Sequence, residues 1–196
     1  MTKRSTATIL NTLEIIGGNP GRMMGPVLLS AIHDMNLATN AEILDVGTGN
    51  GIAAMAVALC GYHVTTGEPE GDNWGPWQEN VENAGVASLV TFQPFDAAAM
   101  PFDDSWFDAI FASGSLHHMA DAGAAIRELM RCIKPAGTIC ILEPTAAGVA
   151  MIQQDNADHP PVLDPRDLVD VEPFEWTLKT GEHFDTYYLR MPENER

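Results

Sequence analysis

Basic residues are scarce in this chain of 196 residues, which has 10 lysines and arginines against 27 aspartates and glutamates, a formal net charge of −17. The acidic residues are spread along the chain rather than gathered in a tail. Phosphate-rich nucleic acids and anionic membrane surfaces bind to basic faces, so the charge disfavours both as partners. An acidic, lysine-poor surface serves solubility or adaptation to salt, and composition does not separate the two.

Cysteines and long apolar runs are also few. Cys60, Cys132 and Cys140 are odd in number and form no closely spaced pair, so neither a disulfide framework nor a metal site is predicted. No apolar run reaches the roughly 18 residues that a membrane span needs. Residues 1–6 are not followed by the apolar stretch of a signal peptide. These absences predict a cytoplasmic protein without membrane insertion.

The elements that are present alternate between strand and helix. Hydrophobic periodicity and turn residues predict strands over residues 42–46, 62–67, 89–93, 107–112, 138–142, 174–179 and 184–189. The same signals predict helices over residues 9–16, 26–35, 52–60, 76–84 and 121–133, with turns at residues 19–21 and 134–137. Short apolar strands that alternate with helices indicate a parallel sheet covered on both faces, and the last two strands read as an antiparallel hairpin.

The length and hydrophobic content fit one α/β domain over residues 1–196. Within it we expect a helical N-terminal cover over residues 1–40. A cofactor-binding core follows over residues 41–145, and a C-terminal helix and hairpin over residues 146–196.

A glycine-rich loop follows the first predicted strand. Gly47, Gly49 and Gly51 alternate with other residues directly before a helix, so the backbone can turn sharply there and approach a ligand closely. Asp45 ends the strand, where it could cap the loop's own amides or meet a ligand's ammonium or hydroxyl group. A tight turn without a ligand would use the same glycines.

The loop fits two cofactors. In one frame, Gly49-x-Gly51-x-x-Ala54 matches a dinucleotide fingerprint, with Glu68 or Glu70 about 20 residues on. In the other frame, the pattern is Asp45-x-Gly47-x-Gly49-x-Gly51.

Residues 43–51 in this second frame resemble the first motif of Rossmann-like S-adenosylmethionine-dependent methyltransferases, of the kind that includes the quinone-biosynthesis enzymes. The resemblance covers about residues 41–145. It implies a seven-stranded, mostly parallel sheet with helices on both faces and a C-terminal antiparallel hairpin. It also implies that Asp45, Gly47, Thr48, Gly49 and Gly51 bind the methionine part of the cofactor.

Further motifs extend the resemblance. Glu68 ends the second strand, where the family holds the ribose hydroxyls, and Glu70 is the reserve. Residues 95–102 resemble the family's acidic motif, which implies that Asp96 accepts a hydrogen bond from the adenine amino group and that Ala97 offers its amide to the ring. Residues 112–118 end in the Leu-His-His signature of small-molecule methyltransferases, and Ser113 in this run is expected to contact the cofactor.

His117 and His118 are the candidate catalytic residues. A histidine at the open end of an α/β sheet can accept a proton from the methyl acceptor or orient it. Either could equally cap the next helix or stabilise its own loop. Glu143 lies on the same rim, where a loop-stabilising role competes with contact to substrate. Arg22 could meet the cofactor's carboxylate, although a solvated side chain is favoured.

The stretch of residues 69–77 departs from the family pattern with glycines, prolines and two tryptophans. Trp74 and Trp77 either cover the adenine or fill a hydrophobic gap.

The sequence thus predicts methyl transfer from S-adenosyl-L-methionine to a small-molecule acceptor by in-line displacement, with S-adenosyl-L-homocysteine as product. A catalytically silent cofactor-binding subunit and a NAD(P)-dependent reductase are the alternatives. Assembly into a homodimer is left open.

Overall fold

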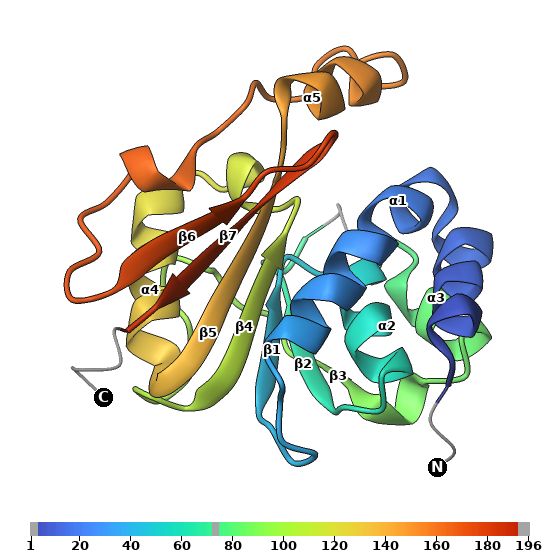
Figure 1. Cartoon of the computed structure of the whole chain (residues 1–196), viewed down its shortest axis with the longest axis horizontal. Coiled ribbons are helices and arrows are strands. Elements are labelled where there is room, and N and C mark those ends of the chain that lie inside the picture. The colour runs from blue at the N-terminus through green and yellow to red at the C-terminus, as the bar shows by residue number, and fades with distance from the viewer. Residues whose placement is uncertain (1–3, 72–74, 192–196) are drawn as a thin grey trace. The chain divides into compact units, whose positions relative to one another are not determined.

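A computed structural model describes residues 4–71 and 75–191 (Figure 1). The chain forms two compact units, Met1–Phe95 and Asp96–Arg196. The first unit contains three parallel strands in the order β3-β2-β1. Its elements are α1 (Thr6–Asp34), β1 (Ile43–Val46), α2 (Ile52–Leu59), β2 (Val64–Gly67), α3 (Trp77–Asn83), η1 (Ala87–Leu89) and β3 (Val90–Phe92).

The helix α2 is the core of the first unit, because every one of its residues is buried. An alanine-rich helix that is apolar on all sides can only be stable when it is covered on all sides. Here α1 packs against α2, and α2 contacts β2, β3 and α3. The expected strand, glycine loop and helix are confirmed in this order.

The helix α1 bends sharply at Gly18, whose φ of 59° and ψ of −142° interrupt the helical backbone. The glycine pair therefore ends the first helical run as expected, but the predicted turn at residues 19–21 is wrong. Pro20 sits near the start of the second run, where its missing N–H costs little. A Cβ atom at Gly21 would lie 1.9 Å from the carbonyl oxygen of Leu13, so this glycine permits close packing within the bent helix.

The second unit contains four strands in the order β4-β5-β7-β6. Its elements are β4 (Phe107–Ser113), η2 (Leu116–His118), α4 (Ala122–Cys132), β5 (Ile133–Pro144), α5 (Ala146–Ile152), η3 (Pro165–Asp167), β6 (Glu175–Lys179) and β7 (Phe184–Arg190). The pair β4–β5 is parallel, whereas β7 runs antiparallel to both β5 and β6. The seven strands and the antiparallel C-terminal hairpin are thus confirmed.

The strand β5 is longer than expected, and the predicted turn at residues 134–137 is wrong. Pairing with β4 begins at Ile133 and then shifts in register between the pairs Phe107–Ile133 and Ala109–Thr138. Gly137 lies in this irregular stretch, where a Cβ atom would come within 2.9 Å of the carbonyl oxygen of Asp108. The proline and glycine therefore form an irregularity inside the strand rather than end it.

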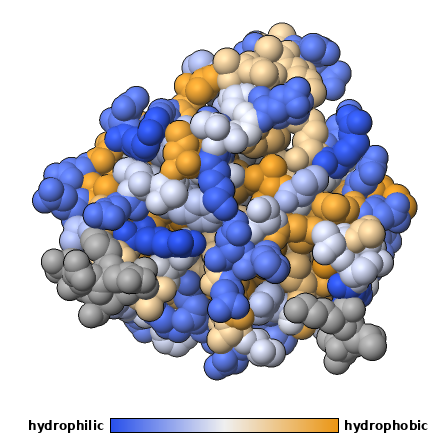
Figure 2. Space-filling view, in the orientation of Figure 1, coloured by the Kyte–Doolittle hydropathy of each residue, from blue (hydrophilic) through white to orange (hydrophobic). Residues whose placement is uncertain are grey.

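The short helix α5 leaves part of its apolar surface exposed. Gly148 and Val149 are buried, whereas Ala146, Ala147 and Ala150 are exposed. Figure 2 shows this surface as the pale orange atoms at its top. Within the described ranges, the helices lack the length or the apolar character needed to pass through a bilayer. The expectation of a single domain over residues 1–196 stays a prediction.

Candidate functional site

The glycine loop between β1 and α2 takes backbone conformations that favour glycine. Gly47, Gly49 and Gly51 have φ values of 89°, 47° and 77°. At Gly51 a Cβ atom would lie 3.1 Å from the Cβ of Trp77, whereas at Gly49 it would meet nothing within 4 Å. The loop is therefore packed against α3 at Gly51 and against Gly75 at the carbonyl group of Gly49, while the position of a Gly49 Cβ is open among the described residues.

Two carboxylates lie beside this loop. One oxygen of Glu68 accepts a hydrogen bond from the amide of Gly49 at 3.0 Å, and the other, Oε1, is buried without a hydrogen-bond partner among the described residues. Asp45 is similar. Its Oδ2 accepts from the hydroxyl of Thr66 at 2.8 Å, while its Oδ1 is buried and unpartnered within the same described part of the chain.

The hydroxyl of Thr66 links Asp45 to the loop. Since Thr66 donates to Asp45, it accepts from the hydroxyl of Thr48, at 2.8 Å. The side chain of Thr48 is thereby engaged inside the protein, and a ligand could meet Thr48 only through its backbone. Thr66 is a residue that the sequence did not single out, because one threonine in a strand carries no recognisable signal.

Burial raises the pKa of Asp45 from 3.8 to about 7. The hydrogen bond from Thr66 opposes this shift, and the nearby charge of Glu68 adds to it. A buried carboxyl of this kind favours a positively charged partner, because the partner restores the ionised form. Unpartnered buried acceptors are uncommon in folded proteins and call for an explanation.

These atoms fit the chemistry of S-adenosylmethionine. The free oxygen of Asp45 suits an ammonium group, and the free oxygen of Glu68 suits a ribose hydroxyl. Among the described residues, the space on the Cβ side of Gly49 leaves room for a ligand against the backbone.

The other candidate residues of the first unit lie in ordinary packing or surface positions. Trp77 stacks on Phe92 with ring centroids 4.8 Å apart and is 9% exposed, so it fills the space between α3 and β3. Trp74 lies outside the described residues. Glu70 is exposed, and Arg22 is exposed with its guanidinium 3.3 Å from the side-chain oxygen of Asn19.

In the second unit, Asp96 is exposed and its carboxylate accepts from the amide of Ala98 at 2.9 Å. Ala97 is buried. Ser113, at the end of β4, has a buried hydroxyl oxygen without a hydrogen-bond partner among the residues that the structure describes. It is a third candidate residue that carries an unused polar atom.

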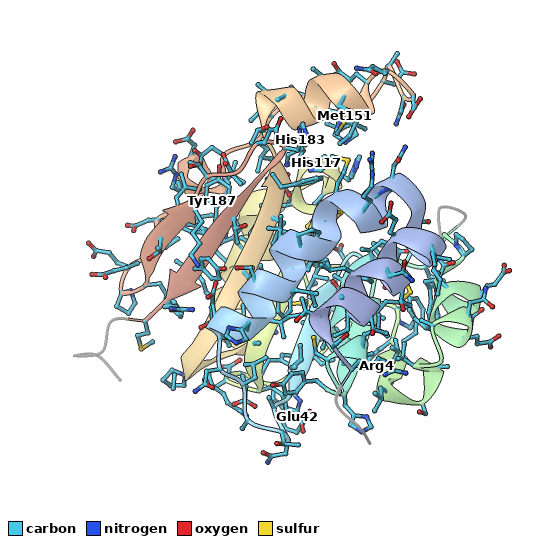
Figure 3. All side chains as sticks on the ribbon, turned by 45° about the vertical axis from the view of Figure 1, so that its right-hand side comes forward. Arg4, Glu42, His117, Met151, His183 and Tyr187 are labelled. Atoms are coloured by element: carbon cyan, nitrogen blue, oxygen red, sulfur yellow. The ribbon has the colours of Figure 1, made fainter. Side chains whose placement is uncertain are left out.

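His117 lies on η2, directly after β4, at the same end of the strands as Met151 and His183 (Figure 3). Its Nδ1 is 2.5 Å from Oε2 of Glu143, and Glu143 is only 1% exposed. The other oxygen of Glu143 accepts from the amide of Leu116 at 3.1 Å. Glu143 therefore holds both the loop and the imidazole in place, and the structure brings it together with His117.

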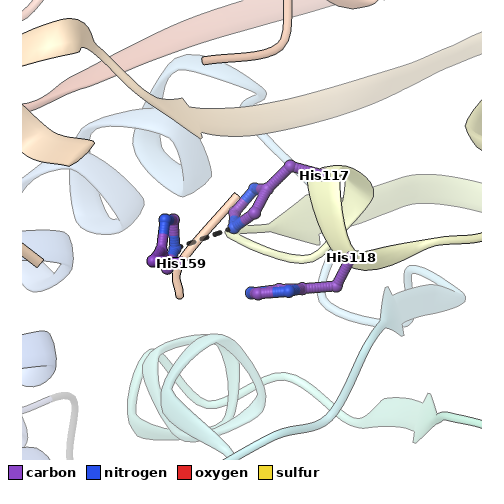
Figure 4. Close-up of side chains that lie close together, drawn as sticks. All are labelled: His117, His118 and His159. Atoms are coloured by element: carbon purple, nitrogen blue, oxygen red, sulfur yellow. Dashed lines mark hydrogen bonds between the residues drawn. The ribbon is translucent and has the colours of Figure 1, made fainter. Parts of the chain in front are cut away.

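A third histidine joins the predicted pair. Nε2 of His159 lies 3.1 Å from Nε2 of His117, and the rings of His117, His118 and His159 face one another (Figure 4). We call these three residues the histidine cluster. His159 was missed by sequence reasoning, because it lies 42 residues beyond His117 in a segment without a motif.

The environment keeps His118 neutral. Burial and, to a smaller extent, the neighbouring His117 and His159 together lower the pKa of His118 from 6.5 to about 4. At neutral pH its ring nitrogens therefore carry one proton and one lone pair. His118 is available as a ligand or a hydrogen-bond partner.

Comparison with known proteins identifies the family. The family model described as a methyltransferase domain matches residues 44–141, which is 98 of the 196 residues. The chain belongs to the class I S-adenosylmethionine-dependent methyltransferases.

Two curated relatives of this chain are methyltransferases by name. The 27-O-demethylrifamycin SV methyltransferase of Amycolatopsis mediterranei is 32% identical over 58% of this chain and 43% of its own. The demethylmenaquinone methyltransferase of Clavibacter sepedonicus is 31% identical over 58% of this chain and 45% of its own. The chain thus spans less than half the length of these relatives.

A solved structure shows the same fold. A methyltransferase from Aquifex aeolicus described as dependent on S-adenosylmethionine superimposes with a TM-score of 0.62 at 18% identity, over 95% of this chain and 99% of its own. The expected Rossmann-like fold is confirmed.

Proposed function

We propose that this chain transfers a methyl group from S-adenosylmethionine to a small-molecule acceptor by in-line displacement. The observation that carries the proposal is a pair of buried oxygens, Oδ1 of Asp45 and Oε1 of Glu68, which have no hydrogen-bond partner within residues 4–71 and 75–191 and lie beside the loop at Gly49. A ligand that offers a cation and hydroxyl groups satisfies both. Family membership supplies that ligand.

The proposed cofactor residues are those that the motifs indicate, namely Asp45, Gly47, Thr48, Gly49, Gly51, Glu68, Asp96, Ala97 and Ser113. Asp45 holds an ammonium group as a carboxylate, and its ionisation is favoured by that contact. Glu68 uses one oxygen to fix the amide of Gly49 and the other to accept from a ribose hydroxyl. Ser113 offers a hydroxyl group that has no partner elsewhere in the described residues.

Bound S-adenosylmethionine supplies an electrophilic methyl group on a positively charged sulfur. The protein's task is then to align the acceptor and exclude water, since no further covalent chemistry is required. In the second unit, Glu143 positions His117 for this task. His117 and His118 orient the acceptor or receive the proton that it loses.

The relatives support a small acceptor. Their names refer to 27-O-demethylrifamycin SV and to demethylmenaquinone, both small molecules. The Leu-His-His run after β4 supports the same class. Neither relative identifies the acceptor of this chain.

Thermal unfolding with S-adenosylhomocysteine or with NAD tests the cofactor. We expect S-adenosylhomocysteine, but not NAD, to raise the midpoint of unfolding of the unmodified chain. Glu68→Gln and Asp45→Asn should each weaken S-adenosylhomocysteine binding about tenfold or more, because a hydrogen bond to a charged group contributes about 1.5–3 kcal/mol. Glu70→Gln is the matched control, since Glu70 is exposed on the same loop. Full protection of both variants would overturn the site.

Transfer is tested separately. Incubation with S-adenosylmethionine labelled on the methyl group and a metabolite extract should place label in small molecules rather than in protein or nucleic acid. Tight binding of S-adenosylhomocysteine without transfer to any extract would favour the silent-subunit alternative.

A further inference from the structure

The histidine cluster brings three ring nitrogens to one place in the second unit. One nitrogen from each of His117, His118 and His159 can be chosen so that all three lie within 4.8 Å of one another. Figure 4 shows the three rings converging from two separate segments of the chain. His159 is 8% exposed, whereas His118 is exposed.

The outer nitrogens of two of these rings are already committed. Nδ1 of His159 lies 2.9 Å from the carbonyl oxygen of Pro160, which can only accept, so this nitrogen carries the ring's proton. Nδ1 of His117 faces the carboxylate of Glu143 and donates to it. In the neutral rings, both Nε2 atoms are therefore lone-pair acceptors.

Those two acceptors face each other at 3.1 Å. Two lone pairs at this distance repel unless a cation lies between them. Either a proton or a metal ion can be that cation. A proton shared between His117 and His159 involves only two nitrogens, so it does not explain why the ring of His118 lies beside them.

The spacing suits a metal ion. Two nitrogens bound to one tetrahedral zinc ion at about 2.1 Å lie about 3.4 Å apart. The 3.1 Å between His117 and His159 is close to this value, and a ring nitrogen of His118 lies within 4.8 Å of both. Metal-bound histidines typically donate their other ring nitrogen to a carboxylate or a carbonyl, as His117 and His159 do here.

We propose that His117, His118 and His159 bind a divalent transition-metal ion of the zinc class. Imidazole nitrogen is a preferred ligand of zinc and of the neighbouring metals cobalt, nickel and copper. Three protein ligands leave a fourth position for water or for an oxygen of another molecule. The buried carboxylate of Glu143 offsets part of the ion's charge and acts as a positioning residue for His117.

The site gives the proposed reaction a way to activate its acceptor. An acceptor hydroxyl bound at the fourth position would release its proton to solvent water more readily, because the ion stabilises the oxyanion. His117 and His118 use their lone pairs to bind the ion in this arrangement, so they orient the acceptor and do not receive its proton. This use of the ion rests on the proposed function. Binding of the ion does not depend on it.

Zinc titration of the full, tag-free chain tests the site after treatment with EDTA and dialysis. Calorimetry should show one Zn²⁺ bound per chain. His159→Gln and His118→Gln should each weaken binding at least tenfold, because each removes a ligand. His63→Gln is the matched control, since His63 is an exposed histidine of the other unit, and it should bind as the unmodified chain does.

Glu143→Gln keeps an acceptor for the amide of Leu116 but removes the charge beside His117, so it should weaken zinc binding about 10- to 100-fold. Circular dichroism and the S-adenosylhomocysteine shift show that each variant is folded. If the unmodified chain binds no Zn²⁺ or Co²⁺, or if His159→Gln and His118→Gln bind as tightly as it does, the metal site is refuted and a shared proton explains the cluster. Protection by S-adenosylhomocysteine would persist in that case, so the proposed function would stand.

Discussion

The glycine loop of the first unit and the histidine cluster of the second unit are built in different ways. The loop depends on backbone conformation and on two acids, each with one buried oxygen, that lie 23 positions apart in the sequence. The cluster depends on side chains that meet across 42 positions, held by one buried carboxylate and one carbonyl. Backbone-based sites follow local sequence patterns, whereas side-chain clusters follow tertiary packing. Four predictions test this contrast.

The largest expected effect lies at Asp45. Its pKa is raised from 3.8 in the unfolded chain to about 7 in the folded protein, so the folded state retains a proton that the unfolded state releases. The contribution of the protonated Asp45 carboxyl to the free energy of unfolding is therefore fully present below pH 3.8, and it is lost as the pH rises to about 7. The loss is on the order of 4 kcal/mol.

Asp45→Asn removes this titration while keeping an acceptor for Thr66. Urea unfolding should show the variant to be more stable than the unmodified chain at about pH 8, with the advantage reduced by more than half at about pH 5. A difference that does not change with pH would contradict the assigned burial of Asp45.

The next effect lies at Gly67, the residue before Glu68. A Cβ atom there would lie 2.0 Å from the carbonyl oxygen of Gln93 and 2.3 Å from the ring of Phe95. Gly67→Ala should lower the free energy of unfolding by about 3 kcal/mol, because backbone must move to relieve the overlap. Gly71→Ala is the control, since a Cβ atom there meets no other described residue within 4 Å. Equal stability of the two variants would show that close backbone packing does not position Glu68.

A smaller effect on stability is expected at Arg131, whose side chain ties down a loop of the second unit through hydrogen bonds to its backbone. Its guanidinium donates to the carbonyl oxygens of Met100 and Phe102, at 3.1 and 2.8 Å, and so holds the loop that carries Asp96. Arg131→Met should reduce stability by about 1–2 kcal/mol, since the side chain is partly exposed. Arg127→Met, an exposed position on the same helix, is the comparison variant. Urea unfolding measures the stability of the two variants, and calorimetry measures their affinity for S-adenosylhomocysteine. Identical results for both variants would show that Arg131 does not hold this loop.

The smallest effect is expected at Arg22. This exposed side chain contacts only a polar neighbour, Asn19, among the interactions described above. Arg22→Ala should change the binding free energy of S-adenosylhomocysteine by no more than about 0.5 kcal/mol, as for other exposed polar pairs. A tenfold loss of affinity in calorimetry would instead place Arg22 at the cofactor.

The sequence by itself determined the elements and the glycine loop. Hydrophobic periodicity and turn residues located the seven strands of the described residues, and the spacing of Gly47, Gly49 and Gly51 predicted a turn that the structure shows with three positive φ values. Local signals succeeded because they report backbone preferences. They failed at residues 19–21 and 134–137, where tertiary packing turned proline and glycine into parts of a helix and a strand.

Only the tertiary structure decided how the polar atoms are used. It engaged the hydroxyl of Thr48 with Thr66, left one oxygen each of Asp45 and Glu68 unpartnered within the described residues, and brought His159 to His117. A pattern in sequence shows which residue types are available and roughly where the backbone turns. Burial and the partners of each atom are set by segments distant in the chain, and these determine which groups remain free to bind.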